Sequence, residues 1–268
     1  KRGIVSPCVF WNEEKDLRAV IHGDDFTLLG SSTSLDWFES AIKEKFEVKV
    51  RGRLGPGVND NKSIRILNRV VDWGDEGIRY EADQRHAEII VREMGLSGGG
   101  GSVVSPYIRD GEDANGKELN KRGATAYRAL VARGIYLAQD RTDIGYAVKE
   151  LARNMSRPKT GDWIKLKRLA RYLVGRERVV IVWAYQDSVS SVDVWVDSDY
   201  AGCRRTRKST SGGVVRLGCH SIKGWSKIQG VIALSSGEAE YYAIVKGASE
   251  GIGIEGILGD LGCWYDTR

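Results

Sequence analysis

The sequence predicts a mixed α+β fold, and three observations support this. Short runs in which apolar and polar residues alternate, such as Val192, Val194 and Val196, are typical of strands. Longer stretches, at 124–139 and 163–175, repeat apolar residues every three or four positions, as helices packed on one face do. The chain has 268 residues, 41% of them hydrophobic, which is enough for a sizeable core and two or three domains.

The first third of the chain contains two short apolar runs on either side of Gly23, Asp24 and Asp25. Because Gly and Asp favour tight turns, this segment predicts a β-hairpin with both carboxylates at its tip. A surface turn whose acids only face water is the alternative. The elements expected next are a helix at 34–46, a strand at 64–71, a turn at 74–77 and a helix at 82–94.

A polar, glycine-rich stretch at 97–123 predicts a flexible linker. A phosphate-binding glycine loop is disfavoured, because no strand directly precedes the glycines and no Lys-Ser or Lys-Thr pair closes them. Three helices are expected after the linker, at 124–139, 144–155 and 163–175.

The last quarter places one carboxylate, Asp197, at the end of an expected strand and a second, Glu240, in the first turn of an expected helix. Ser235 and Glu238 have the spacing of a capping box, which marks the start of that helix. A hairpin at 211–217 and 221–227 lies between them in the chain. The apolar face of the helix is predicted from Tyr241, Ile244, Val245, Ala248 and Ile252.

Composition sets further limits on the function. The formal net charge of +5 permits a polyanionic partner without requiring one. The four cysteines lack C-x-x-C spacing, which favours reduced thiols in an intracellular protein over a zinc site. No run approaches eighteen apolar residues, so no membrane partner is expected. The first residue is Lys1 rather than Met, which suggests an internal fragment.

Several motifs occur in a fixed order between residues 192 and 255. They are D-x-D-Y-A-G, R-K-S-T-S-G, G-W-S-K and A-L-S-S-x-E-A-E-Y. This order resembles the ribonuclease H domain of copia-type LTR retrotransposon Pol polyproteins. The hairpin around Asp24 and Asp25 is similar to the reverse-transcriptase palm motif of the same family, although His22 replaces its aromatic residue and Gly23 fills its variable position.

The helical region resembles the segment that joins the polymerase to ribonuclease H in this family, so the resemblance covers nearly the whole chain. It implies four parts in order: a reverse-transcriptase palm remnant at 1–96, a flexible linker at 97–123, a helical connection at 124–180 and a ribonuclease H-like domain at 181–268, truncated at its C-terminus. The implied activity is copying RNA into DNA and cleaving the RNA strand of RNA–DNA hybrid.

The resemblance assigns catalysis and metal binding to Asp24, Asp25, Asp197 and Glu240. The implied cofactor is Mg²⁺, with Mn²⁺ as an alternative, in two-metal chemistry. Asp199 and Glu238 are expected to support these ligands rather than replace them. The family's other acids, one upstream of Asp24 and two downstream of Glu240, are not in this chain, so both metal sites are expected to be incomplete.

Basic residues provide the expected contacts to nucleic acid. Arg204, Arg205, Arg207 and Lys208 follow the Asp197 strand, and Lys165 and Arg168 belong to a basic row on a helix. Such residues neutralise phosphates without reading sequence, and the alternative for both groups is a solvated face.

The implied partners are RNA–DNA hybrid, an RNA template, a DNA primer and the remainder of the Pol polyprotein. The implied location is intracellular, in cytoplasmic virus-like particles and the nucleus. Two other interpretations are a catalytically inactive, nucleic-acid-binding relic of such an element and a host regulatory protein built on the ribonuclease H fold.

Overall fold

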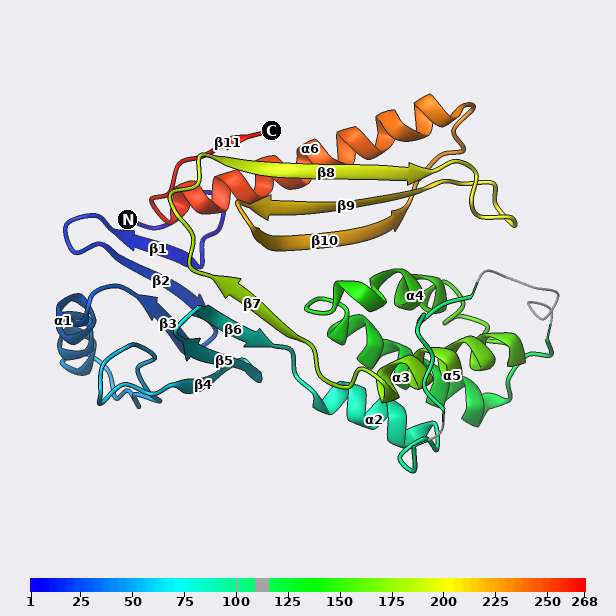
Figure 1. Cartoon of the computed structure of the whole chain (residues 1–268), viewed down its shortest axis with the longest axis horizontal. Helices are drawn as coiled ribbons and strands as arrows, with labels where there is room; N and C mark the ends of the chain where they lie inside the picture. The colour runs from blue at the N-terminus through cyan, green and yellow to red at the C-terminus, as the bar shows by residue number, and fades with distance from the viewer. Residues whose placement is uncertain (100, 109–115) are drawn as a thin grey trace. The chain divides into compact units, whose positions relative to one another are not determined.

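A computed structural model describes residues 1–99, 101–108 and 116–268 and has a mixed α+β fold, as the sequence predicts (Figure 1). Its strands form three sheets within the described residues. Part of the predicted linker, residue 100 and residues 109–115, lies outside the described residues. The chain forms two compact units, one made of residues 1–61, 184–224 and 229–268 and the other of residues 62–183 and 225–228. The four-part division inferred from the family remains a prediction.

The first unit begins with an antiparallel sheet in the order β1-β2-β3. Its strands are β1 (Val9–Asn12), β2 (Leu17–His22) and β3 (Asp25–Leu29), and β2 and β3 form the predicted hairpin. Gly23 has a φ of +63°, a left-handed conformation that glycine adopts without steric cost, which explains its place in this turn. Helix α1 (Ser32–Lys43) follows, and its N-cap Ser31 accepts a hydrogen bond from the Ser34 backbone N–H.

The second sheet of this unit has the order β10-β9-β8-β11. Strand β8 (Ser191–Asp199) pairs antiparallel with β9 (Thr210–Leu217) and parallel with the short β11 (Asp266–Thr267). Strand β10 (His220–Ile228), whose residues 225–228 are assigned to the second unit, completes the predicted hairpin with β9. Helix α6 (Ser236–Asp260) lies along β8 and β9 (Figure 1).

The predicted apolar face of α6 is wrong. The helix buries Ala239, Ala243, Gly247 and Gly251, whereas Tyr241, Ile244, Val245, Ala248 and Ile252 are exposed. The buried residues repeat every four positions and have almost no side chain, so the helix backbone can approach the sheet closely. An added Cβ at Gly247 would lie 2.4 Å from Val196 Cγ1. The prediction considered hydrophobicity alone, which favours the larger residues. Close packing of the helix on the sheet requires the smaller ones.

The second unit contains an antiparallel meander and a further strand, in the order β4-β5-β6-β7. The prediction of a single strand at 64–71 is wrong, because this segment forms two strands joined by a turn. Leu67 and Asn68 both have positive φ, +47° and +67°, which reverses the chain between them. The strands are β4 (Ser63–Ile66), β5 (Arg69–Gly74), β6 (Gly77–Glu81) and β7 (Val180–Ala184), and the predicted turn at 74–77 connects β5 to β6.

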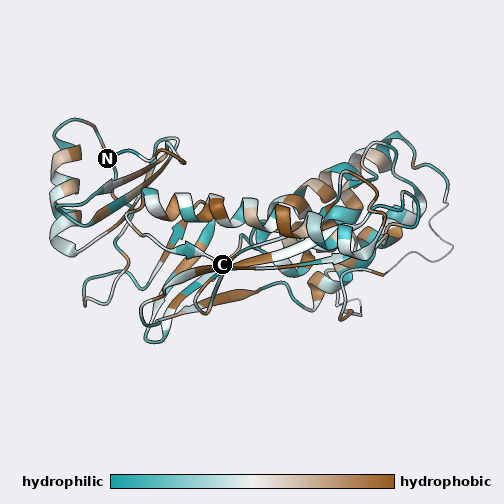
Figure 2. Cartoon of the chain, turned by 90° about the horizontal axis from the view of Figure 1, so that it is seen from above, coloured by the Kyte–Doolittle hydropathy of each residue, from teal (hydrophilic) through white to brown (hydrophobic). Residues whose placement is uncertain are grey.

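In the part of the second unit that the structure describes, four helices pack around one core. They are α2 (Arg85–Glu93), α3 (Lys121–Leu137), α4 (Thr142–Ala152) and α5 (Thr160–Val174), each within a few residues of its predicted range. Fully buried members of this core include Tyr127, Ile144, Leu166, Leu169 and Leu173. The alternation of apolar and polar residues along the elements can be followed in Figure 2. No helix within the described residues is long and apolar enough to cross a membrane.

Candidate metal centre and nucleic-acid interface

Glu240 contacts the residue that follows Asp197. The Ser198 backbone N–H and hydroxyl both donate to Glu240 Oε1, at 3.3 and 2.9 Å. Asp197 itself is exposed and pairs with Gly212 across the β8–β9 ladder. The structure therefore brings both predicted carboxylates to the same end of β8, although their sequence positions are far apart.

The start of α6 determines where Glu240 lies. N-cap Ser235 accepts the Glu238 backbone N–H at 3.1 Å, as the capping pattern predicts. The Glu238 carboxylate accepts the Leu234 backbone N–H at 2.7 Å, so it helps to cap the helix. Glu238 is the acidic residue of the first turn, whereas Glu240, predicted in that turn, lies just beyond it and contacts β8.

The two carboxylates lie on either side of the β8 end. Side chains alternate along a strand, and Val194 and Val196 lie against Gly247 of α6. Ser198 shares that face and contacts Glu240, so Asp197 is on the opposite face. Asp197 and Glu240 are therefore the residues at this strand end that would hold a metal ion.

Asp199, which was expected to support the ligands, accepts a hydrogen bond from the Thr210 backbone N–H. Thr210 is its partner in the ladder, so Asp199 fixes the last pair of strand residues before the chain enters the β8–β9 loop. This contact holds the β8 end in place beside Asp197.

The donor chemistry at this strand end suits Mg²⁺. Carboxylate oxygens are hard ligands, and Mg²⁺ is commonly held by one or two protein carboxylates together with water and substrate phosphate. Asp197 and Glu240 would supply this pair. No group of three or more His, Cys, Asp or Glu side chains suited to a metal ion occurs within the described residues.

Asp24 and Asp25 lie at the turn between β2 and β3, as predicted. Asp25 is 3.2 Å from the guanidinium of Arg51, in an exposed ion pair. The two acids do not combine with Asp197 and Glu240 into a single acidic cluster, because such a cluster would have three or more members within the described residues. The hairpin acids therefore lie apart from the strand-end carboxylates, and their role as a site remains a prediction.

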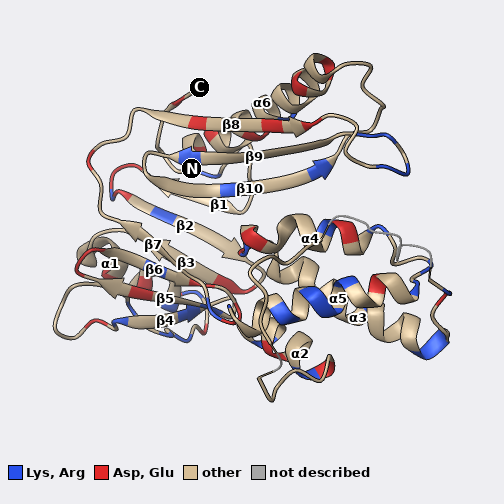
Figure 3. Ribbon diagram, turned by 45° about the vertical axis from the view of Figure 1, so that its right-hand side comes forward, with Lys and Arg blue, Asp and Glu red and all other residues tan. Residues whose placement is uncertain are grey.

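The basic residues predicted to contact nucleic acid occupy two separate elements (Figure 3). Arg204, Arg205 and Arg207 are exposed in the β8–β9 loop, next to the Asp197 strand end. Lys208 donates to the Gly230 carbonyl, which restrains the loop. An exposed row of guanidinium groups beside a carboxylate site is suited to phosphate contacts.

The second basic group lies on α5, in the other unit. Lys165 and Arg168 are partly buried along this helix, so part of each side chain packs against the protein. Arg168 Nε is buried and lacks a hydrogen-bond partner within the described residues. Arg171, one turn further on, donates to the Gly101 carbonyl at 2.7 Å. This helix face is less accessible than the β8–β9 loop.

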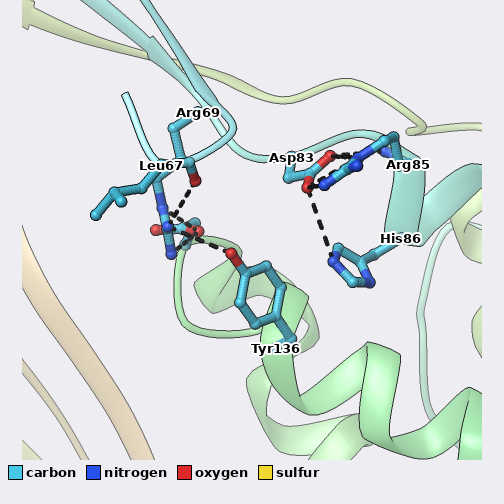
Figure 4. Close-up of polar contacts among 7 residues, drawn as sticks. Leu67, Arg69, Asp83, Arg85, His86 and Tyr136 are labelled. Carbon is cyan, nitrogen blue, oxygen red and sulfur yellow. Dashed lines mark hydrogen bonds and ion pairs between the residues drawn. The ribbon is translucent and has the colours of Figure 1, made fainter. Parts of the chain in front are cut away.

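A polar cluster that sequence reasoning missed joins the β5–β6 hairpin to α3 and α2 (Figure 4). Arg69 contacts Asp140 at 3.0 Å and the Tyr136 hydroxyl at 3.4 Å, and His86 packs on the Tyr136 ring. Burial raises the pKa of Tyr80, as does its hydrogen bond to Asp140. Sequence reasoning missed this cluster because contacts between single Arg, Asp and Tyr residues that are far apart in the chain leave no periodic pattern in the sequence. The contacts hold elements of the second unit together.

The sequence also gave no sign of the roles of Ser198 and Gln229. Ser198 was only the variable residue of D-x-D, yet it holds Glu240. Gln229 was a polar residue after a strand, yet it is buried between β9 and α6. Both roles depend on contacts with residues that are distant in the sequence and become neighbours only in the folded chain.

Together the described elements define an α+β protein with a carboxylate-bearing strand end and a basic loop beside it. No family model matches the sequence, and no solved structure matches the chain.

Comparison with curated proteins reveals related sequences. A retrovirus-related Pol polyprotein from transposon TNT 1-94 of Nicotiana tabacum is 32% identical over 267 residues, which cover 96% of this chain and 19% of the relative. The Pol polyprotein from transposon RE2 of Arabidopsis thaliana is 38% identical over 52% of this chain and 9% of its own length. An uncharacterized mitochondrial protein of Arabidopsis thaliana is 37% identical over 46% of this chain and 51% of its own length.

Its relatives include retrotransposon Pol polyproteins, which is consistent with the chain being a fragment of such a polyprotein, as its motifs predict. It corresponds to a fraction of those polyproteins, from 9% to 19% of the two Pol relatives named above.

Proposed function

We propose that this chain is the part of a retrotransposon Pol protein that engages RNA–DNA hybrid, with a ribonuclease H centre at the end of β8. The contact between Glu240 and Ser198 supports this proposal most directly, because it brings two carboxylates to one strand end beside exposed arginines. In the same proposal, Asp24 and Asp25 are carboxylates of a polymerase centre that copies an RNA template from a DNA primer.

At the ribonuclease H centre, Asp197 and Glu240 would hold Mg²⁺. In two-metal chemistry one bound ion would supply an activated water molecule and a second would supply charge stabilisation for the leaving 3′ oxygen of the RNA strand. The protein's own residues supply position and charge: Ser198 orients one oxygen of Glu240, and Asp199 fixes the strand end. Arg204, Arg205 and Arg207 would bind the phosphates on either side of the cleavage point.

Binding and cleavage are expected to differ in strength. Phosphate contacts depend on the basic loop, which is exposed, so the chain should bind hybrid with an affinity that falls steeply with salt. Cleavage depends on the position of the metal, and two carboxylates hold it less firmly than a fuller ligand set. The second candidate, an inactive nucleic-acid-binding relic, is compatible with the same basic loop but predicts no cleavage at all.

The experiment compares the wild-type chain with Asp197→Asn and Asp193→Asn in assays of Mg²⁺-dependent hybrid cleavage and of hybrid binding from 50 to 300 mM salt. Asp193 is a matched control because it lies on the same face of β8 as Asp197, but near the opposite end of the strand. We expect slow cleavage that Asp197→Asn abolishes and Asp193→Asn leaves unchanged. Cleavage that survives Asp197→Asn would reject the proposed centre, and salt-insensitive binding would reject the phosphate contacts.

A further inference from the structure

Gln229 is a buried amide between the start of β9 and the start of α6. The residue is 7% exposed. Its Nε2 donates to the Ala239 carbonyl at 2.8 Å and to Ser211 Oγ at 3.0 Å. Its backbone N–H donates to the Ser209 carbonyl at 2.8 Å. One residue thus connects two elements that meet beside Glu240.

These bonds close a ring of contacts around the helix start. Ser211 lies across from Ser198 in the β8–β9 ladder, and the two side chains share the face that α6 covers. Ser198 in turn donates to Glu240, the residue after Ala239. Gln229 therefore joins the strand pair to the helix on one side of Glu240, and Ser198 joins them on the other.

The other end of the same amide is unsatisfied. Gln229 Oε1 is buried and lacks a hydrogen-bond partner within the described residues. Leaving a buried acceptor unpaired is unfavourable, and an apolar side chain of similar volume would avoid that cost. The residue is thus explained by the two hydrogen bonds that Nε2 donates, rather than by filling of space.

From this geometry we infer that Gln229 is a positioning residue, which fixes the start of α6 so that the Glu240 carboxylate faces the end of β8. The metal-binding consequence rests on the proposed function, whereas the effect on Glu240 itself does not. Residues that orient metal ligands through hydrogen bonds typically change metal affinity by about 10- to 100-fold when they are replaced.

The decisive variant is Gln229→Met, which keeps the volume and the apolar packing but removes both donated hydrogen bonds. Gln186→Met is the matched control, because Gln186 is exposed. The hydrogen bonds between its side-chain amide and the backbone of Leu217 and Cys219 lie at the opposite end of β9. Each full-length variant is titrated with Mn²⁺, followed by electron paramagnetic resonance, and its Ser198 amide is followed by ¹⁵N NMR and hydrogen exchange. Melting temperature reports on folding.

We expect Gln229→Met to keep its melting temperature within about 3 °C of the wild type, to lower Mn²⁺ affinity by about 10-fold and to shift the Ser198 amide and speed its exchange. A variant with an unchanged Ser198 amide would overturn the inference. If the wild type and Asp197→Asn bind Mn²⁺ equally, the proposed metal centre fails, while the Ser198 amide still decides the role of Gln229.

Gln229→Glu covers the case in which the methionine variant does not fold. It keeps the shape of the side chain but places an oxygen where Nε2 meets the Ala239 carbonyl. The Ser198 amide should shift in this variant as well, and an amide that stays at its wild-type position would again contradict the inference.

Discussion

The Asp260 carboxylate accepts the backbone N–H of Ser6 at 2.8 Å, which joins the end of α6 to the first residues of the chain. Ile4 and Val5 donate to the same carboxylate at 2.8 and 2.9 Å. Beside this contact, Arg18 Nε donates to the Leu261 carbonyl at 2.8 Å. Three consecutive N–H groups around one anion form a specific attachment of the N-terminal segment to α6.

The first prediction concerns this attachment. The hydrogen bonds from Ser6 and Ile4 lower the pKa of Asp260 below its usual value of 3.8, so the stabilisation is present above pH 3.8 and is lost as pH falls further. Asp260→Asn should lower the melting temperature at pH 7 by about 2 °C and should weaken the acid dependence below pH 4. Scanning fluorimetry across this pH range measures both effects. Asp266→Asn, at an exposed residue of β11, is the control.

The second prediction concerns a buried ion pair in the helical unit. Arg141 is 2% exposed and donates from Nε and Nη2 to the two Asp143 oxygens, at 2.9 and 2.7 Å. Burial raises the pKa of Asp143, but the hydrogen bonds and charge of Arg141 outweigh this and lower it. Asp143→Asn would leave the Arg141 charge buried without its counter-ion, so it should cost about 3 kcal/mol in the free energy of unfolding measured in urea.

An exposed ion pair provides the comparison. Arg92 and Glu93 have side chains that are 66% and 53% exposed, so Glu93→Gln should change the free energy of unfolding by less than about 0.5 kcal/mol. Equal effects of Asp143→Asn and Glu93→Gln would show that the pair at the start of α4 is not effectively buried.

The third prediction is a pH dependence at His86. Burial lowers the pKa of His86, and the charges of Arg133 and Arg85 add to this against the opposing Asp83 carboxylate. A lowered folded-state pKa means that the unfolded chain binds a proton first, so the His86 contribution to stability is lost as pH falls below 6.5. Urea unfolding should show lower stability at pH 5.5 than at 7.5.

His86→Gln should reduce that difference, whereas His22→Gln, at the exposed last residue of β2, should not. Tyr136 packs on the His86 ring with centroids 4.5 Å apart, so Tyr136→Leu should also reduce the difference by hydrating the imidazole. If the free energy of unfolding changed with pH equally in the wild type and in all three variants, the role of His86 would be contradicted.

The order of elements could be predicted from the sequence because local signals determine it. The alternation in β8, the Ser235 cap and the Gly23 turn each depend on neighbouring residues, and the structure confirms them. The turn at Leu67 and Asn68 was missed because leucine rarely adopts a positive φ.

The site was only partly predictable. The motifs predicted that Asp197 and Glu240 meet, but they could not show that Ser198 rather than Asp197 contacts Glu240, or that Gln229 donates to the Ala239 carbonyl. Those contacts depend on the register of β8 with β9 and on the depth at which α6 packs. The catalytic roles of Asp24, Asp25, Asp197 and Glu240 remain predictions.

The last prediction tests the buried small-residue face of α6, which the sequence pattern did not indicate. Alanine favours helix over glycine by about 1 kcal/mol, so Gly→Ala should stabilise α6 wherever space allows. At Gly253 an added Cβ meets nothing within 4 Å, and Gly253→Ala should raise the free energy of unfolding by about 0.5 to 1 kcal/mol.

At Gly247 the same Cβ would lie 2.4 Å from Val196 Cγ1, and valine is stiff at χ1, so the helix must move away from β8. Gly247→Ala should therefore lower the free energy of unfolding by about 1 to 3 kcal/mol, despite its better helix propensity. Both variants remove one glycine from the same helix, so only the packing differs between them. If urea unfolding shows that both are stabilised, α6 does not rest on β8 through Gly247, and the contact between Glu240 and Ser198 would lose its structural support.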